Sequence, residues 1–257
     1  FENDDIIHVS GKVNPLDDVD TINTELALAD LLSAEKSYQK AIKNSKAGQK
    51  EGLPLKNLLE KILPKLEEGI AIRSVEFNPD EHKLIKSLQL LTSKPVLYVA
   101  NVSDSGFVNN PHLEELKDYA KNQNSEVVAV CADIEAEIAE LDDDDKQGFL
   151  DEMGQKESGL DRLIKAGYGL LGLQTYFTAG VKEVRAWTIN VGDSAPVAAG
   201  KIHGDFEKGF IRAETISYKD FIDYKGEKGS KDAGKLRSEG KEYIVQDGDV
   251  VHFLFNV

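Results

Sequence analysis

The apolar and polar positions of the first 91 residues follow a helical pattern. Residues 21–46 place an apolar side chain every three to four positions, at Ile22, Leu26, Ala29 and Leu32. Residues 53–69 do the same at Leu55, Leu58, Leu59, Ile62 and Leu66. The short glycine-containing stretch between them predicts an antiparallel hairpin of two long helices. Asn78 followed by Pro79 predicts the start of a third helix, which we expect to end near Leu91.

The pattern then changes to alternating strands and helices. Residues 96–100 and 126–130 are apolar runs of strand length, and residues 111–122 between them have helical spacing. This order predicts a parallel sheet of an α/β nucleotide-binding domain, whose ligands bind beyond the carboxyl ends of the strands. The apolar residues 6–9 predict a further short strand end. The acidic residues 139–154 predict a solvated helix or loop.

From Val184 onward the pattern is that of strands. Residues 184–192, 209–218 and 242–257 alternate apolar and polar side chains. Asp247-Gly248 lies inside the last of these segments and predicts a hairpin turn. The chain therefore closes with a small β domain.

Charge divides the chain in the same way. The whole chain has 31 basic and 46 acidic residues and a net charge of −15. Residues 173–257 hold 12 basic and 13 acidic residues, so residues 1–172 hold 19 and 33. The overall balance argues against non-specific binding to nucleic acid, and we expect no DNA specificity. The nearly neutral last third predicts that this part of the chain binds a different partner from the acidic first two thirds.

The composition favours a reducing compartment. Cys131 is the single cysteine, which excludes an intramolecular disulfide. No apolar run approaches the roughly 20 residues that cross a bilayer. We therefore expect a cytoplasmic protein with no membrane partner.

Three sequence features suggest a functional site at first, and none of them has the context that such a site requires. Residues 167–172, GYGLLG, match the dinucleotide pattern G-x-G-x-x-G. That function requires a strand before the first glycine, whereas the preceding residues have helical period, so we expect glycines that allow close helix packing. The five histidines show no spacing typical of metal ligands. Cys131 follows a strand and is expected to be a buried thiol and not a nucleophile.

The polar residues Asn101-Val102-Ser103-Asp104 follow the apolar run 96–100 directly. In a nucleotide-binding domain such an asparagine can hold the loop that surrounds a purine. An aspartate three positions later can accept the N1 and 2-amino protons of guanine, a donor pair that adenine lacks. The alternative is an ordinary Asn/Asp turn with a structural role.

Five segments resemble the YchF family of Obg-like ATPases. They are TINTELALADL (21–31), KPVLYVANVSDSGF (94–107), LQTYFTAGVKEVRAWTI (173–189), HGDFEKGFIRAE (203–214) and YIVQDGDVVHFLFNV (243–257). The resemblance implies an α/β, P-loop NTPase fold with three parts. Residues 1–20 and 92–171 would be the remainder of an Obg-type G domain, residues 21–91 an inserted helical arm, and residues 172–257 a TGS domain of β-grasp fold.

The resemblance also implies an activity. The family hydrolyses ATP with Mg²⁺ and binds the ribosome, which predicts a nucleotide-dependent switch linked to translation or stress. The family's phosphate-binding loop and Mg²⁺ ligands are expected before Phe1. Residues 1–257 are therefore expected to contain no catalytic or metal-binding residue and to be inactive as they stand. The alternative is a non-catalytic module that binds RNA or the ribosome and keeps a vestigial nucleotide pocket.

The resemblance assigns roles to individual residues. Asn101, Val102 and Asp104 occupy the guanine-selecting N-K-x-D positions, and Cys131 and Ala132 would flank the base. The missing lysine favours ATP, whereas the family usually has glutamate at the position of Asp104, so GTP stays open as a second ligand. Candidates for contact with RNA are four basic side chains: Lys201, His203, Lys208 and Arg212.

Overall fold

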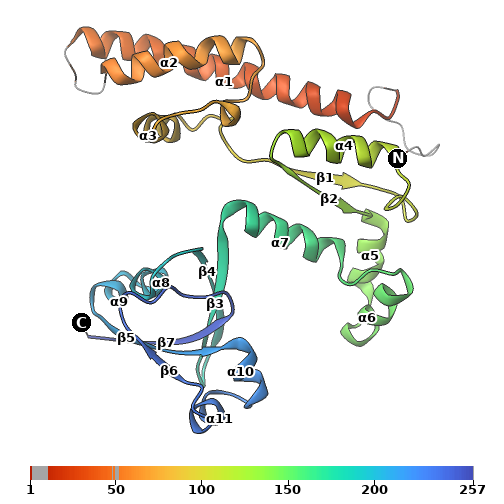
Figure 1. Cartoon of the computed structure of the whole chain (residues 1–257), viewed down its shortest axis with the longest axis vertical. Coiled ribbons are helices and arrows are strands. Elements are labelled where there is room, and N and C mark those ends of the chain that lie inside the picture. Colours follow the sequence, from red (N-terminus) through yellow and green to blue (C-terminus); the bar gives the residue numbers. More distant parts are fainter. Residues whose placement is uncertain (2–10, 48, 50–51, 257) are drawn as a thin grey trace. The chain divides into compact units, whose positions relative to one another are not determined.

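The computed structural model describes Phe1, residues 11–47, Gln49 and residues 52–256. The predicted strand end at residues 6–9 lies outside these residues. The chain divides into two compact units, Phe1–Ala166 and Gly167–Val257 (Figure 1). In the part of the chain that the structure describes, no helix is long and apolar enough to cross a membrane.

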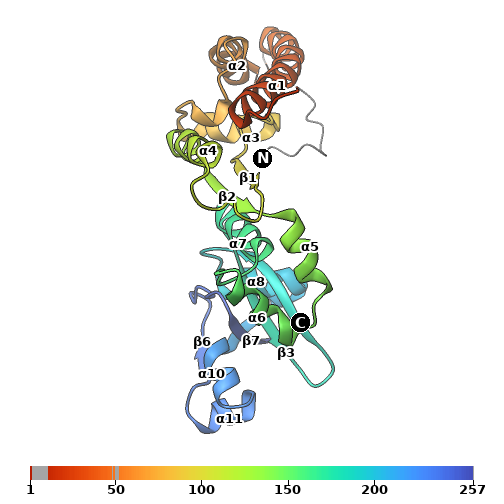
Figure 2. The same cartoon turned by 90° about the vertical axis from the view of Figure 1, so that its right-hand side faces the viewer.

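The first unit begins with four helical elements, which are α1 (Pro15–Lys46), α2 (Gly52–Glu67), the 3₁₀ helix η1 (Ile72–Ser74) and α3 (Pro79–Leu88). Helices α1 and α2 lie side by side (Figure 1 and Figure 2). α1 starts six residues before the predicted Thr21. The reason is an N-cap at Asn14, whose side chain accepts a hydrogen bond from the Asp17 amide, followed by proline at the first helical position.

The buried face of α1 differs from the predicted one. Ile22 and Leu32 are 54% and 60% exposed, and the buried positions are Ala27, Asp30, Ala34 and Ala41. The predicted stripe of α2 is correct, because Leu58, Leu59, Ile62 and Leu66 are buried and Leu55 packs against them. The bulky leucines of α2 thus fill the space beside a narrow alanine face, and larger side chains on α1 remain in solvent.

The start of α3 agrees with the sequence and its end does not. The Asn78 side chain accepts hydrogen bonds from the Asp80 and Glu81 amides, and the Glu81 carboxylate accepts one from the Asn78 amide. This capping box fixes the first turn. The helix ends at Leu88 because Gln89 adopts a left-handed conformation, with φ of 54°.

The predicted strand, helix and strand follow. They are β1 (Leu97–Asn101), α4 (Pro111–Asn122) and β2 (Glu126–Val130), and the two strands pair in parallel with Asn101 opposite Val130. Three helices complete the unit, α5 (Ala132–Glu140), α6 (Asp143–Glu152) and α7 (Gly159–Leu171), the last of which extends into the second unit. The acidic segment forms α6, whose first-turn aspartates are exposed as expected.

The second unit contains a sheet with the strand order β4-β3-β7-β5-β6. Its strands are β3 (Leu173–Ala179), β4 (Val184–Asn190), β5 (Phe210–Ser217), β6 (Arg237–Glu239) and β7 (Asp249–Phe255). Its helices are α8 (Ala195–Ile202), α9 (Gly204–Lys208), α10 (Tyr218–Asp223) and α11 (Glu227–Asp232). β3 and β7 run in parallel, and the other neighbouring strands are antiparallel. Alanines of α8 pack against Tyr176 and Phe253 to form the core.

The predicted hairpin at Asp247-Gly248 is wrong. Residues 242–246 form no strand, and Ile244 makes only an isolated bridge to Ser194. The turn precedes β7, which pairs with β3 and β5 instead. β3 was not predicted as a strand, although it forms an antiparallel hairpin with β4. The hairpin error arises because β7 is central and pairs with strands that are distant in sequence.

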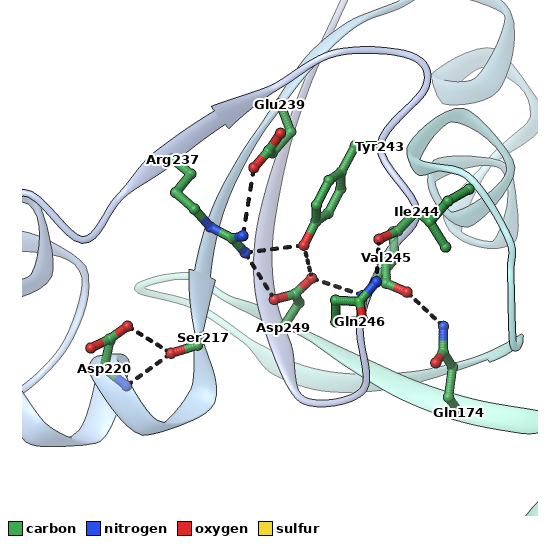
Figure 3. A network of polar contacts seen from close by, with 10 residues as sticks. All are labelled: Gln174, Ser217, Asp220, Arg237, Glu239, Tyr243, Ile244, Val245, Gln246 and Asp249. Carbon is green, nitrogen blue, oxygen red and sulfur yellow. Dashed lines mark hydrogen bonds and ion pairs between the residues drawn. The ribbon is translucent and has the colours of Figure 1, made fainter.

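Asp249 holds the segment before β7 in place, as Figure 3 shows. The side chain is 3% exposed and accepts hydrogen bonds from the Tyr243 hydroxyl (2.6 Å) and the Gln246 amide (2.9 Å). Arg237 lies 3.4 Å from its other oxygen. A buried carboxylate is tolerated here because each of its oxygens has a partner.

This network predicts a decline in stability at high pH. Burial raises the pKa of Tyr243 to about 12. An unfolded tyrosine ionises near pH ~10, so between these values the unfolded state binds fewer protons and unfolding becomes more favourable as pH rises. The Tyr243→Phe variant should show a shallower decline, measured as urea unfolding at several pH values by fluorescence of Trp187. Equal slopes in both proteins would contradict this assignment.

Candidate functional site

The carboxyl ends of β1 and β2 are joined by Asn101. The Val102 amide donates to the Val130 carbonyl at 2.8 Å, which continues the strand pairing by one residue. The Asn101 side-chain oxygen accepts a hydrogen bond of 3.1 Å from the Ala132 amide, at the start of α5. Asn101 is exposed and lies where a loop-holding asparagine was predicted. Its contact with a base stays a prediction.

The neighbouring residues can contribute only particular atoms. Val102 is 4% exposed and its amide is already bonded, so its carbonyl oxygen is the backbone group left for a ligand. Cys131 is 2% exposed and its carbonyl accepts from the Glu135 amide. The expected buried thiol is therefore confirmed. Ala132 is exposed beside Asn101.

Asp104 lies on an ordered turn and faces solvent. Its side chain accepts a 2.7 Å hydrogen bond from the Ser105 amide, and the Gly106 amide donates to the Ser103 carbonyl at 2.9 Å. Asn110 donates to the Gly106 carbonyl at 3.0 Å. Because the turn is fixed from both sides, the Asp104 carboxylate has a defined position and remains open to a ligand.

Two side chains that the sequence did not single out support this edge. Arg162 on α7 donates to the Ala129 carbonyl of β2 at 3.0 Å and lies 5.8 Å from the centre of the Phe107 ring. Glu135 on α5 accepts a 2.7 Å hydrogen bond from the Gly159 amide, the first residue of α7. A Cβ atom at residue 159 would lie 2.7 Å from the Glu135 carboxylate, so a larger residue there would displace the Glu135 side chain from this hydrogen bond. No local motif marks either side chain.

The glycines of residues 167–172 lie in α7 and at its end, as predicted. The expected close packing is wrong, since a Cβ atom at Gly167 or Gly169 would meet nothing within 4 Å. Of these three glycines, only Gly172 has a backbone conformation that favours glycine, with φ of +61° at the junction with β3. The motif is therefore no phosphate-binding loop.

The four basic candidates for RNA contact are exposed and lie on α8, α9, β5 and the residue between the helices. His203 caps α9 by accepting from the Asp205 amide at 3.2 Å, and Arg212 pairs with Glu214 at 3.4 Å. An acidic neighbour thus offsets the charge of Arg212. Contact of Lys201, His203, Lys208 or Arg212 with RNA stays a prediction.

Among the described residues, no three or more His, Cys, Asp or Glu side chains lie close enough together to hold a metal ion. Mg²⁺ as a cofactor stays a prediction.

Comparison with known proteins identifies the family. The family model described as "YchF-GTPase_C: Protein of unknown function (DUF933)" matches residues 173–256. A protein of Haemophilus influenzae, "Ribosome-binding ATPase YchF", is 60% identical over 257 residues, which are 100% of this chain and 71% of the relative. The chain belongs to the YchF family. A Bacillus subtilis YchF of the same name is 54% identical over 260 residues, again covering 100% of this chain and 71% of the relative.

A solved YchF structure supports the α/β fold. The structure of the Schizosaccharomyces pombe YchF GTPase matches with a TM-score of 0.81 and 34% sequence identity, over 98% of this chain and 69% of that chain. The names of these YchF proteins differ in the nucleotide, since the two bacterial proteins are called ATPases and the Schizosaccharomyces pombe protein a GTPase.

Proposed function

We propose that this protein is a ribosome-associated, Mg²⁺-dependent ATPase in which the edge formed by Asn101, Val102, Asp104, Cys131 and Ala132 binds the base. The observation that carries the proposal is identity of 60% over all 257 residues to a relative named as a ribosome-binding ATPase. The hydrogen bond from Ala132 to Asn101 supplies the structural support, because it orders both loops beside the predicted base site.

The hydrogen-bond acceptors of this edge match the donor of adenine and can also match those of guanine. The Val102 carbonyl is an acceptor and matches the 6-amino donor of adenine. The exposed Asp104 carboxylate matches the donor pair of guanine. We propose ATP as the main nucleotide and GTP as a second ligand.

The remaining parts of the proposal follow the family. Residues 172–257 would act as a TGS domain and the helices of residues 21–91 as an arm inserted into a G domain, with ribosome contacts on both. The phosphate groups and Mg²⁺ would be held by a phosphate-binding loop that the family carries before these segments, so residues 1–257 alone would not hydrolyse ATP. The protein would work in the cytoplasm as a nucleotide-dependent switch in translation.

The proposal predicts that Asn101→Ala weakens ATP binding to the intact protein by about 5–10-fold. The variant loses the side-chain oxygen that accepts the Ala132 amide proton, and one such hydrogen bond contributes about 1 kcal/mol. Calorimetric titration with ATP and Mg²⁺ measures the change. The exposed Asn122 at the end of α4 provides the control, and Asn122→Ala should bind ATP as the parent does.

The non-catalytic alternative is distinguished by two measurements on the intact protein. Co-sedimentation with ribosomes, together with no binding of ATP or GTP in calorimetry, would replace the ATPase by an RNA- or ribosome-binding module. Binding of nucleotide without any co-sedimentation would remove the ribosome from the proposal.

A further inference from the structure

The second unit has an open groove of ≈ 480 Å³ that no predicted function uses. Its lining residues come from the hairpin of β3 and β4, from α8 and α9, and from β7; these elements are labelled in Figure 1. The groove is large enough for one nucleotide and is open to solvent. Its volume and position indicate a binding site, and its lining indicates the ligand.

Aromatic rings form much of the lining. Phe206 and Phe255 are stacked, with ring centres 3.7 Å apart and planes at 24°. The Trp187 ring is held by a hydrogen bond of 2.9 Å from its Nε1 atom to the Thr178 hydroxyl. Since that polar atom is already satisfied, the ring offers a fixed, flat, apolar surface. Such surfaces bind unstacked nucleic-acid bases, with about 1–3 kcal/mol for each base.

Cations lie beside these rings. The Arg185 guanidinium lies 4.2 Å from the centre of the Trp187 ring, and Lys182 lines the groove at the hairpin. In the described part of the chain, neither cation has an ion-pair partner. Glu183 is the single acid in the lining. Lys182 and Glu183 balance each other within the lining, so the surplus positive charge beside the groove is that of Arg185, which favours an anionic group at this end of the groove.

We propose that this groove binds an unpaired nucleotide of single-stranded RNA, with the base against Trp187 and the phosphate beside Arg185 and Lys182. Flat rings next to unpaired cations match a planar base joined to a phosphate better than they match an acidic peptide, whose side chains are not planar aromatic groups. The inference rests on the proposed ribosome association, and it moves the RNA contact from scattered lysines to a defined groove.

Trp187 makes the proposal directly testable because it is the only tryptophan of residues 1–257, and the signal lost in Trp187→Phe identifies its contribution in the intact protein. Titration of the intact protein with short single-stranded oligoadenylate RNA should quench its fluorescence to saturation. The double variant Lys182→Ala/Arg185→Ala should bind about tenfold more weakly. The matched control Lys228→Ala/Lys231→Ala removes two exposed lysines from α11, outside the groove, and should leave the affinity unchanged.

Further experiments distinguish stacking of a base on Trp187 from binding by charge alone. Inorganic polyphosphate should give neither strong binding nor quenching, and an acidic peptide should not compete with RNA. Equal competition by either would overturn the inference. In anisotropy measurements with labelled RNA, Trp187→Phe should retain binding and Trp187→Leu should lose about tenfold, while unchanged circular dichroism shows that both remain folded.

Ribosome co-sedimentation distinguishes failure of this inference from failure of the proposed function. If the intact protein co-sediments with ribosomes but RNA does not quench Trp187, the groove inference is wrong and the ribosome association stands. If co-sedimentation itself is absent, the ribosome association in the proposed function fails regardless of what the groove binds.

Discussion

Asp30→Ala is expected to lower the free energy of unfolding of the first unit by about 3 kcal/mol. The Asp30 side chain is 2% exposed and accepts three hydrogen bonds, from the Leu91 amide (2.8 Å), the Thr92 amide (2.7 Å) and the Thr92 hydroxyl (2.6 Å). Alanine would leave the two buried Thr92 donors and the part-buried Leu91 amide without this acceptor, at a cost of about 1–3 kcal/mol for each group that water cannot reach.

The effect should extend beyond Asp30 because Thr92 joins several segments. The Thr92 hydroxyl oxygen accepts from the Ile72 amide at 3.3 Å, and the Thr92 carbonyl accepts from the Arg73 amide at 3.0 Å. Asp30 therefore connects α1, the 3₁₀ helix η1 and the link that leads to β1. Loss of the carboxylate should loosen the position of the arm helices relative to that link.

Urea unfolding of the intact protein, followed by far-ultraviolet circular dichroism, measures this loss. Glu35→Ala removes an exposed acid from the same helix and should change stability by less than about 0.5 kcal/mol. Asp30→Asn keeps the volume but presents an N–H group to one of the donors, so an intermediate loss is expected. A loss for Asp30→Ala no larger than that for Glu35→Ala would show that the hydrogen bonds are not required.

The contrast between α2 and α1 shows how far periodicity predicts a buried face. Leucines dominate the pattern of α2, and they are buried. On α1 the buried residues are alanines and Asp30, which weigh little in a search for apolar spacing, so the larger Ile22 and Leu32 suggested the wrong face. An aspartate within a helix is usually exposed, and its partners here are about 60 residues away. Local sequence contains no information on such a contact.

The base-binding edge was predictable where it depends on strand order alone. An apolar run that ends at Asn101 and another that ends before Cys131 place both residues at the carboxyl ends of parallel strands. The roles of Arg162 and Glu135 were not predictable, because each contacts an element that is distant in the chain. The same limit explains the wrong hairpin at Asp247-Gly248, since β7 pairs with β3 and β5, which lie far earlier in the chain.

Asp104→Ala is expected to reduce GTP affinity by about 30-fold or more and to change ATP affinity by less than about threefold. If Asp104 accepts the N1 and 2-amino protons of guanine, the variant loses two charge-assisted hydrogen bonds, each of about 1.5–3 kcal/mol in the absence of compensation by water. Adenine lacks that donor pair and loses nothing directly. Competition of ATP and GTP against a fluorescent nucleotide, in the intact protein with Mg²⁺, measures both affinities.

Asp104 tests base selection better than the neighbouring Val102. Lysine at the 102 position would restore the guanine-selecting motif, but the side chain there is 4% exposed, and a buried ammonium group would disturb the fold as well as the ligand. Asp104 is exposed, and its one hydrogen bond is to the next amide, so alanine should leave the edge intact. Asp118→Ala on α4 serves as the charge-matched control. An equal loss of ATP and GTP affinity in Asp104→Ala would mean that the carboxylate orders the turn and does not recognise the base, which would leave the Val102 carbonyl and the Asn101 loop to select adenine.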